Sequence, residues 1–206
     1  MRKPENAIYI IAILHVVGLF GLNSGFREFF QLLTPLNLLI AAGLFLYTST
    51  GINTRASIGL ATVYACGFGI EWIGVNTGFP FGTYAYGTVL GPKLGNTPLL
   101  IGVNWVMLVT TVTLIGRLFS QHTAVIAVIG GLLMTLLDIL IEPVAIQTGM
   151  WHWFGHNPPI QNYIAWFVIA SLLTAFLHEL SPRIKNPAAV GFYAIQFIFF
   201  AVMNLV

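Results

Sequence analysis

The sequence contains few charged residues. Eight basic and six acidic side chains make up 7% of the 206 residues, whereas hydrophobic residues make up 57%, and the mean hydropathy is +0.88. A soluble domain carries about 25% charged residues. The charged side chains are therefore too few to cover a surface that faces water, and the composition predicts an integral membrane protein.

Cysteine and clustered basic residues are also scarce. The single cysteine, Cys66, lies in a hydrophobic run; it excludes a disulfide framework and is predicted to be a small buried residue. The Lys and Arg residues are scattered and the net charge is +2, so no nucleic-acid partner is indicated. Residues 1–6 and the apolar run after them imitate a signal peptide, but no A-x-A cleavage site follows. We therefore expect a retained first helix.

Seven apolar segments are each close to the roughly 20 residues that span a bilayer. They cover residues 7–22, 32–48, 57–75, 97–116, 123–146, 160–179 and 188–206. The connections are short except at 76–96 and 147–159, and there is no internal repeat or long linker. The expected fold is all-α: one transmembrane domain over residues 1–206, a bundle of about seven helices.

The Lys and Arg residues at the segment ends predict the orientation, because cytoplasmic loops carry the excess of these residues. Arg27 and Lys93 fall on one side. The other side carries Arg2, Lys3, Arg55, Arg117, Arg183 and Lys185. We expect an N-in/C-out protein of the cell (inner) membrane, with both long connections on the outer side.

The fifth apolar segment carries two carboxyl groups. Asp138 and Glu142 are four residues apart, which is about one helical turn, so they share a face. Gly131 and Met134 extend this face, where a glycine would leave room for a ligand. Pro143 removes a backbone donor and predicts a kink beside Glu142. At least one of two carboxyls this close is expected to be a protonated acid; a purely structural hydrogen-bonded pair between helices is the alternative.

Further polar side chains are predicted at the same depth. Glu71 lies in the outer third of the third segment, and Asn104 lies about 10 Å below the outer surface at a rise of about 1.5 Å per residue. Asn37 and Asn162 are within two turns of the outer ends of their segments. With the two carboxyls of the fifth segment, six polar side chains from five segments converge. This pattern indicates a buried site open toward the outer leaflet.

Aromatic residues are concentrated around this level. Those of the two long connections suit either an aromatic belt at the lipid headgroups or the cover of a pocket. They include Tyr84, Tyr86, Trp151 and Trp153. Trp72, Trp105 and Trp166 lie within or just inside apolar segments. A ring face near two carboxyls can stabilise a carbocation by cation–π attraction.

Histidine provides only part of a possible metal site. His152 and His156 are four residues apart, but the chain has five histidines in all. The di-iron oxygenases of membranes use repeated histidine clusters, which are absent here. We therefore expect no metal.

Five stretches, taken in order, resemble one known family. They are EWIGVNTGFPFGTYAYG at 71–87, LGNTPLLIGVNW at 94–105, D-x-x-x-E-P at 138–143, WHW at 151–153 and QNYIAW at 161–166. Together they resemble the membrane-embedded carotenoid hydratases, of the bisanhydrobacterioruberin hydratase and γ-carotene 1′-hydroxylase type, over about residues 57–180. The resemblance implies that water is added across the terminal double bond of an acyclic carotenoid end, without an organic cofactor. It further implies other carotenoid-pathway enzymes as partners, and it places Glu71, Asp138 and Glu142 at the family's polar positions.

The residues suit this chemistry. Protonation of a trisubstituted alkene gives a tertiary carbocation that water captures. A site for this needs a carboxylic acid, a polar group that holds the water, and an apolar aromatic channel. We expect Asp138 and Glu142 to supply the proton and Glu71 to position the water. The residues expected to bind substrate are Trp72, Tyr84, Tyr86, Asn104, Trp105, Trp151, Trp153, Asn162 and Trp166.

Other functions remain open from the sequence. A membrane cyclase of the lycopene type would use the same acid and the same carbocation but close a ring. A non-catalytic carotenoid or isoprenoid carrier would use the aromatic channel and treat the carboxyls as structural. A proton-coupled transporter is a weaker fit, because no inverted repeat is present.

Overall fold

The computed structural model describes residues 3–206, and most of them are helical. The helices are α1 (Pro4–Leu22), α2 (Arg27–Leu32), α3 (Thr34–Thr48), α4 (Thr54–Thr77), α5 (Leu99–Phe119), α6 (Thr123–Gln147), α7 (Ile160–Leu180) and α8 (Ala189–Met203). The strands are β1 (Tyr84–Tyr86), β2 (Lys93–Leu94), β3 (Thr97–Pro98) and β4 (Trp151–Trp153). The predicted all-α class is confirmed.

Within residues 3–206, five helices are long and apolar enough to cross a membrane, namely α1, α4, α5, α6 and α7. The apolar helices α3 and α8 have 15 residues each. At about 1.5 Å per residue they extend about 22 Å, which is less than the hydrocarbon core of about 30 Å. The protein is therefore an all-helical membrane protein with five candidate spans.

The segment predicted to start at residue 32 is preceded by a separate helix. α2 ends at Leu32, and α3 begins at Thr34 with Pro35 in its first turn. Pro35 has no N–H to donate to the carbonyl of Gln31, so a continuous helix would lose that hydrogen bond. The chain starts a new helix instead.

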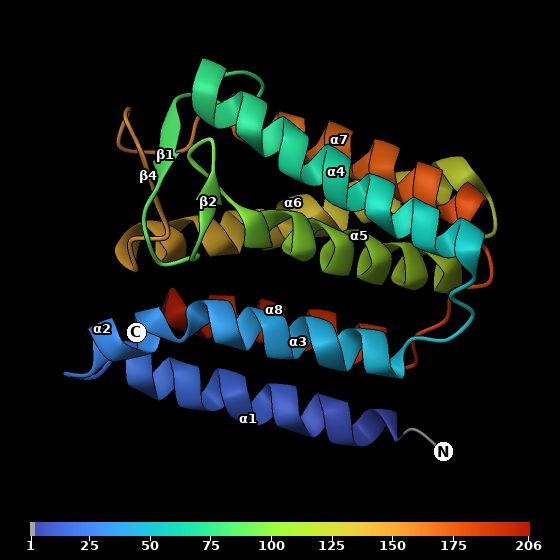
Figure 1. Ribbon diagram of the computed structural model, residues 1–206, viewed down its shortest axis with the longest axis horizontal. Helices are drawn as coiled ribbons and strands as arrows, with labels where there is room; N and C mark the ends of the chain where they lie inside the picture. The colour runs from blue at the N-terminus through green and yellow to red at the C-terminus, as the bar shows by residue number, and fades with distance from the viewer. Residues whose placement is uncertain (1–2) are drawn as a thin grey trace.

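The helices form two layers (Figure 1). One layer holds α4, α5, α6 and α7, with β1 and β4 at one end; α1, α3 and α8 lie on the other side. α5 is central and contacts α3, α4, α6, α7 and α8. In its most apolar stretch 67% of the residues are buried, against at most 39% in the other candidate spans.

The ends of α4 follow from its flanking residues. At the start, the side chain of Asn53 accepts a hydrogen bond of 2.9 Å from the backbone N–H of Ala56, a standard N-cap. At the end, Gly78 adopts φ 76°, the left-handed conformation that terminates many helices. The first long connection therefore begins two turns after Glu71, which places its aromatic residues near that carboxyl.

Two small residues differ from their predicted roles. Gly131 lies where α6 meets α7, and a Cβ atom there would come within 2.8 Å of the carbonyl oxygen of Phe167. The space at Gly131 therefore admits α7 and not a ligand, so that prediction was wrong. Cys66 was predicted to be buried but is exposed on α4. On a membrane helix, lipid solvates an apolar side chain about as well as protein does.

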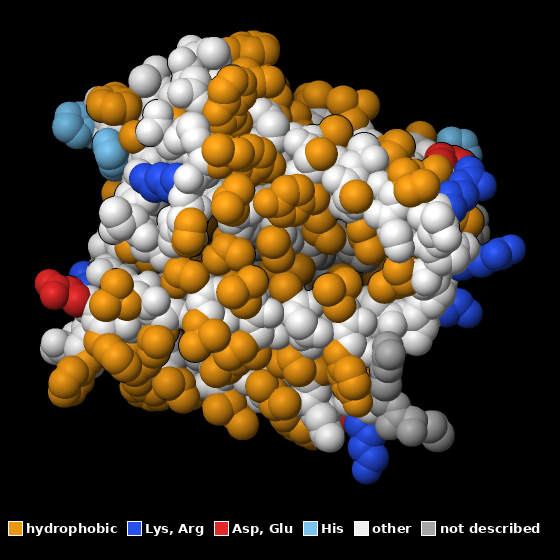
Figure 2. Space-filling model, in the orientation of Figure 1, with side chains coloured by type: hydrophobic (Ala, Val, Ile, Leu, Met, Phe, Trp, Pro, Cys, Tyr) orange, Lys and Arg blue, Asp and Glu red, His pale blue; other side chains and the backbone are white. Residues whose placement is uncertain are grey.

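The charged side chains in view gather at the two ends of the longest axis, and hydrophobic side chains cover the surface between them (Figure 2). The two chain ends also lie at opposite ends of this axis (Figure 1). An apolar band between two charged ends is the surface expected of a molecule whose long axis crosses a bilayer.

Candidate active site

Two three-residue strands pair at one end of the bundle and form what we call the aromatic ribbon, β1 with β4. The strands are antiparallel, with Tyr84 opposite Trp153 and Tyr86 opposite Trp151. Because side chains alternate across a strand, these four aromatic side chains share one face of the ribbon. Their polar atoms contact carboxyl groups on α4 and α6.

Glu71 of α4 is 3% exposed and accepts three hydrogen bonds. Its Oε2 accepts from the hydroxyls of Tyr84 (2.5 Å) and Tyr86 (2.8 Å). Its Oε1 accepts from the indole N–H of Trp105 (3.2 Å). The pKa values of both phenols are raised above the usual value, mainly by burial and to a lesser extent by the charge of Glu71. The two tyrosines therefore stay protonated and act as donors.

Glu142 of α6 is held by the other strand of the ribbon. Its Oε2 accepts hydrogen bonds from the indole N–H groups of Trp151 (3.0 Å) and Trp153 (2.8 Å). One short ribbon thus supplies hydroxyl donors to a carboxyl on α4 and indole donors to a carboxyl on α6.

Asp138 lies one turn before Glu142 and is 1% exposed. The side-chain amide of Asn162, on α7, donates from Nδ2 to Asp138 Oδ2 (2.8 Å) and to Glu142 Oε1 (3.4 Å). Asn162 therefore joins both carboxyls across the contact between α6 and α7.

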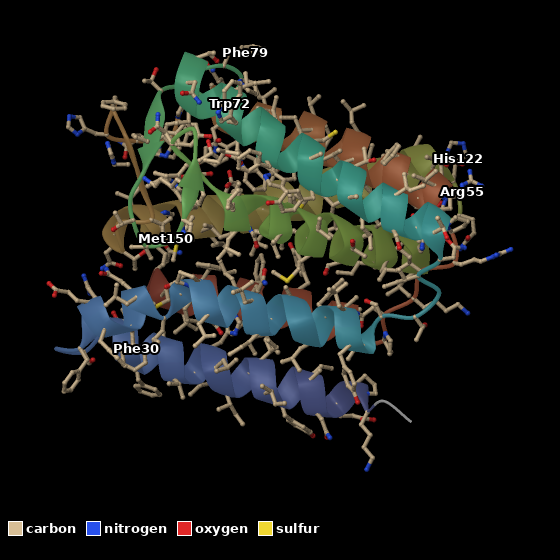
Figure 3. All side chains as sticks on the ribbon, viewed as in Figure 1. Phe30, Arg55, Trp72, Phe79, His122 and Met150 are labelled. Carbon is tan, nitrogen blue, oxygen red and sulfur yellow. The ribbon has the colours of Figure 1, made fainter. Side chains whose placement is uncertain are left out.

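These groups border a cavity of about 220 Å³ between the two helix layers. The predicted convergence of six polar side chains is confirmed. The six are Asn37, Glu71, Asn104, Asp138, Glu142 and Asn162. The remaining wall is mainly apolar. In Figure 3, two lining residues, Met150 and Phe30, approach the cavity from opposite layers, while Arg55 and His122 lie at the far end of the molecule.

Most of the residues predicted to bind substrate border this cavity. They are Tyr84, Tyr86, Asn104, Trp151, Trp153, Asn162 and Trp166. Trp105 is buried behind the wall and stacks on Trp166, with ring centroids 4.6 Å apart and planes 17° apart. It reaches the site through its hydrogen bond to Glu71.

Trp72 does not belong with this group. It is 45% exposed and lies near the turn at Phe79, at the ribbon end of α4 (Figure 3). Trp72 directly follows Glu71, and consecutive helical positions point about 100° apart. A helix that aims Glu71 into the bundle therefore turns Trp72 away from it, and the predicted role of Trp72 beside the carboxyls is not supported.

The sequence reasoning missed the part of the wall that comes from α1 and α8. His15 and Gly18 of α1 and Gln196 of α8 line the cavity. Polar side chains within apolar helices were the available signal for His15 and Gln196. On α3, Asn37 Oδ1 is buried and has no hydrogen-bond partner among the described residues, so it can receive a hydrogen bond from water or a ligand.

The histidines predicted to resemble half of a metal site lie apart from the carboxyls. His152 pairs with Ala85 on the opposite face of the ribbon from the four donors and contacts the ring of Phe154. Within residues 3–206, no group of three or more His, Cys, Asp or Glu side chains could hold a metal ion.

Apolar helices around a buried cluster of carboxyls define the class of protein, which is a helical membrane protein with a buried polar site. The chain belongs to the carotenoid biosynthesis protein family, which it matches over residues 30–206. The resemblance recognised in the motifs is thereby confirmed.

One curated relative is the bisanhydrobacterioruberin hydratase of Haloarcula japonica. The two sequences are 32% identical over 130 residues, which is 59% of this chain and 44% of that protein. The match thus spans less than half of the relative's length. No solved structure matches the chain.

Proposed function

We propose that this protein is a carotenoid hydratase that adds water across the terminal double bond of an acyclic carotenoid end group by acid catalysis. The observation that carries the proposal is the presence of three buried carboxyl side chains around one largely apolar cavity. Ionisable residues among membrane helices are costly and usually functional. Membership of the carotenoid biosynthesis family and the hydratase name of the relative support the substrate class.

The Asp138–Glu142 pair supplies the proton in this proposal. An O–H bond of the acid breaks as a C–H bond forms at the less substituted alkene carbon, and the π electrons leave a tertiary carbocation on its neighbour. A water molecule attacks this carbon, and its proton returns to the carboxylate that the first step produced. The acid regains the proton that it gave to the alkene, so the net change is the addition of one water, and no organic cofactor is needed.

The other groups hold the water and the cation. Glu71, fixed by its three donors, accepts a hydrogen bond from the attacking water and orients it. Trp166 borders the cavity and is backed by Trp105, so an aromatic face is available to a cation by cation–π attraction. The apolar wall keeps bulk water from competing with the positioned molecule.

We further propose that the five candidate spans and the shorter helices α3 and α8 all cross the cell (inner) membrane as one transmembrane domain, with the N-terminus inside and the C-terminus outside. A bilayer thins locally around helices that are shorter than its hydrocarbon core. Support comes from the six-to-two distribution of Lys and Arg between the two ends and from the positions of the termini in Figure 1. Other carotenoid-pathway enzymes supply the acyclic substrate.

The test is co-expression with a lycopene or γ-carotene pathway in a host that lacks hydratases, followed by mass analysis of the pigments. We expect a product heavier by one water, without a new ring. The double variant Asp138→Asn/Glu142→Gln should leave the carotenoid unmodified, whereas Glu28→Gln, an exposed carboxyl outside the cavity, should act like the wild type. A ring-closed product of unchanged mass would instead indicate a cyclase. Unmodified pigment bound to the wild-type protein would indicate a carrier.

A further inference from the structure

The three carboxyls of the cavity receive unequal numbers of hydrogen bonds. Glu71 accepts three from side chains, and Glu142 accepts three, one of them long. Asp138 accepts one, from Asn162 to Oδ2. Among residues 3–206, no side chain donates a hydrogen bond to Asp138 Oδ1. Asp138 therefore has the fewest donors, and it is also the least exposed of the three carboxyls.

The chemical nature of the donors around Glu142 favours its charged form. An indole N–H and the NH2 group of an amide donate hydrogen bonds and cannot accept them. Oε2 of Glu142 lies between two indole N–H groups, and Oε1 faces the amide nitrogen of Asn162. Hydrogen bonds donated to a carboxylate favour its charged form. The ribbon therefore stabilises Glu142 as an anion.

The same reasoning leaves Asp138 as the acid. A carboxylate at Glu142, one turn away, opposes a second negative charge on Asp138. An ionised Asp138 would be buried with a single hydrogen-bond donor, and one hydrogen bond does not compensate a carboxylate for the loss of its hydration. A neutral Asp138 can carry its proton on Oδ1 and still accept the Asn162 hydrogen bond on Oδ2.

We propose that, within the hydratase reaction proposed above and resting on it, Asp138 is the proton donor and Glu142 remains a carboxylate. The proton leaves Asp138 Oδ1 for the alkene carbon, and Asn162 stabilises the new Asp138 carboxylate through Oδ2. The proton lost by the attacking water returns to Asp138. Trp151 and Trp153 are positioning residues, because they act through Glu142.

The direct test measures protonation without turnover. Infrared spectra of the purified protein in a detergent without carbonyl groups, at neutral pH and without carotenoid, contain a C=O stretching band of a carboxylic acid if one is protonated. We expect this band in the wild type, in Glu142→Gln and in the control Glu28→Gln, and its loss in Asp138→Asn. A band that persists in Asp138→Asn and disappears in Glu142→Gln or Glu71→Gln would overturn the assignment, as would the absence of the band from the wild type.

Activity gives a second readout in the co-expression host. Asp138→Asn should lower hydration by at least about 100-fold, the usual contribution of a general acid, and Asp138→Glu should restore part of it. Trp153→Phe keeps the ring but removes one donor to Glu142, and it should lower hydration while the infrared band of Asp138 remains. If the wild type adds no water, the proposed function fails whichever residue carries the band. If the wild type adds water and the band belongs to Glu142, only the assignment of Asp138 fails.

Discussion

Gly67 of α4 lies directly against the indole of Trp105 on α5: a Cβ atom at residue 67 would stand 2.5 Å from Cβ and Cγ of that tryptophan. The absence of a side chain lets the two helices approach closely, as small residues commonly do in membranes. Gly67 is also one turn before Glu71. The close approach therefore sets the position of the Trp105 N–H, which donates to that carboxyl.

Replacing Gly67 should therefore affect the site and not only the helix contact. In Gly67→Ala the added methyl group displaces Trp105 and weakens its hydrogen bond to Glu71, so hydration should fall several-fold. Gly69→Ala on the same helix is the matched control, because a Cβ there meets nothing within 4 Å. It should be neutral, or more stable by up to about 1 kcal/mol. Product yield and thermal unfolding in detergent measure both effects, and equal activity of the two variants would contradict this account.

Glu71→Gln separates protonation from water capture. The amide should still allow the first step, because the Asp138–Glu142 pair is intact, but the water is no longer held correctly. We expect the hydrated product to fall at least about tenfold, or about 1.4 kcal/mol in barrier, and rearranged alkenes or rings to appear in the pigment extract. Tyr86→Phe, which removes one of the three donors to Glu71, should give an intermediate loss. If Glu71→Gln stops all conversion while Asp138→Asn and Glu142→Gln stay near normal, Glu71 is the acid.

The cavity wall from α1 can be tested at Gly18. A Cβ atom there would meet Phe199 at 3.9 Å, an ordinary contact, so the helix tolerates a side chain while the cavity loses space. Gly18→Leu should therefore lower hydration and carotenoid binding without unfolding the protein. Gly43→Leu on α3 is the control, since Gly43 is exposed and a Cβ there meets nothing within 4 Å. α1 lies before the residues that match the family, so this variant tests whether that helix contributes to the site. Unchanged hydration and binding in Gly18→Leu would mean that it does not.

Pro143 lies inside α6, which continues through it to Gln147. A proline at such a position removes the hydrogen bond to the carbonyl of Ile139 and bends a helix. Pro143→Ala should restore that bond, straighten α6 and shift Glu142 relative to the ribbon. Turnover should then fall while thermal stability is unchanged or higher, since a proline inside a helix costs about 3 kcal/mol. Normal turnover of correctly inserted protein would show that the bend is incidental.

The orientation in the membrane has a direct test. Reporter fusions after Val206 and in the connection near Lys93 should both report an external location, because these points lie at the end of the molecule with fewer Lys and Arg residues. A fusion beside Arg55, at the opposite end (Figure 3), should report the cytoplasm. A cytoplasmic signal near Lys93 would reverse the proposed topology.

Local spacing predicted the helical part of the site. Asp138 and Glu142 share a face because they are one turn apart, and depth along the helices brought Asn104 and Asn162 to the same level. The same spacing shows why Trp72 was misplaced: it was chosen for its chemistry, although its position directly after Glu71 turns it away. Hydropathy placed the seven main helices to within a few residues, but it did not predict the short helix α2, which ends at Leu32.

The aromatic ribbon could not be derived in this way. Its strands are three residues long, and Tyr84 pairs with Trp153 across two intervening membrane helices. Pairing between such distant residues depends on the packing of those helices and not on any local preference. The alternating patterns Tyr-x-Tyr and Trp-x-Trp were visible and have the period of a strand. Nothing local, however, indicated that the two patterns would face each other.

The ribbon also restricts how a substrate can arrive. Two of the three donors to Glu71 and two of the three donors to Glu142 lie on its strands. Moving the ribbon aside would therefore remove most of the hydrogen bonds to both carboxyls and open the cavity to external water. Access past the ribbon and an assembled site are therefore mutually exclusive. A route between the helices leaves the ribbon in place, and Val17 of α1 marks one, because it borders the cavity and is 48% exposed. A long hydrocarbon dissolved in the bilayer is already on that side of the wall.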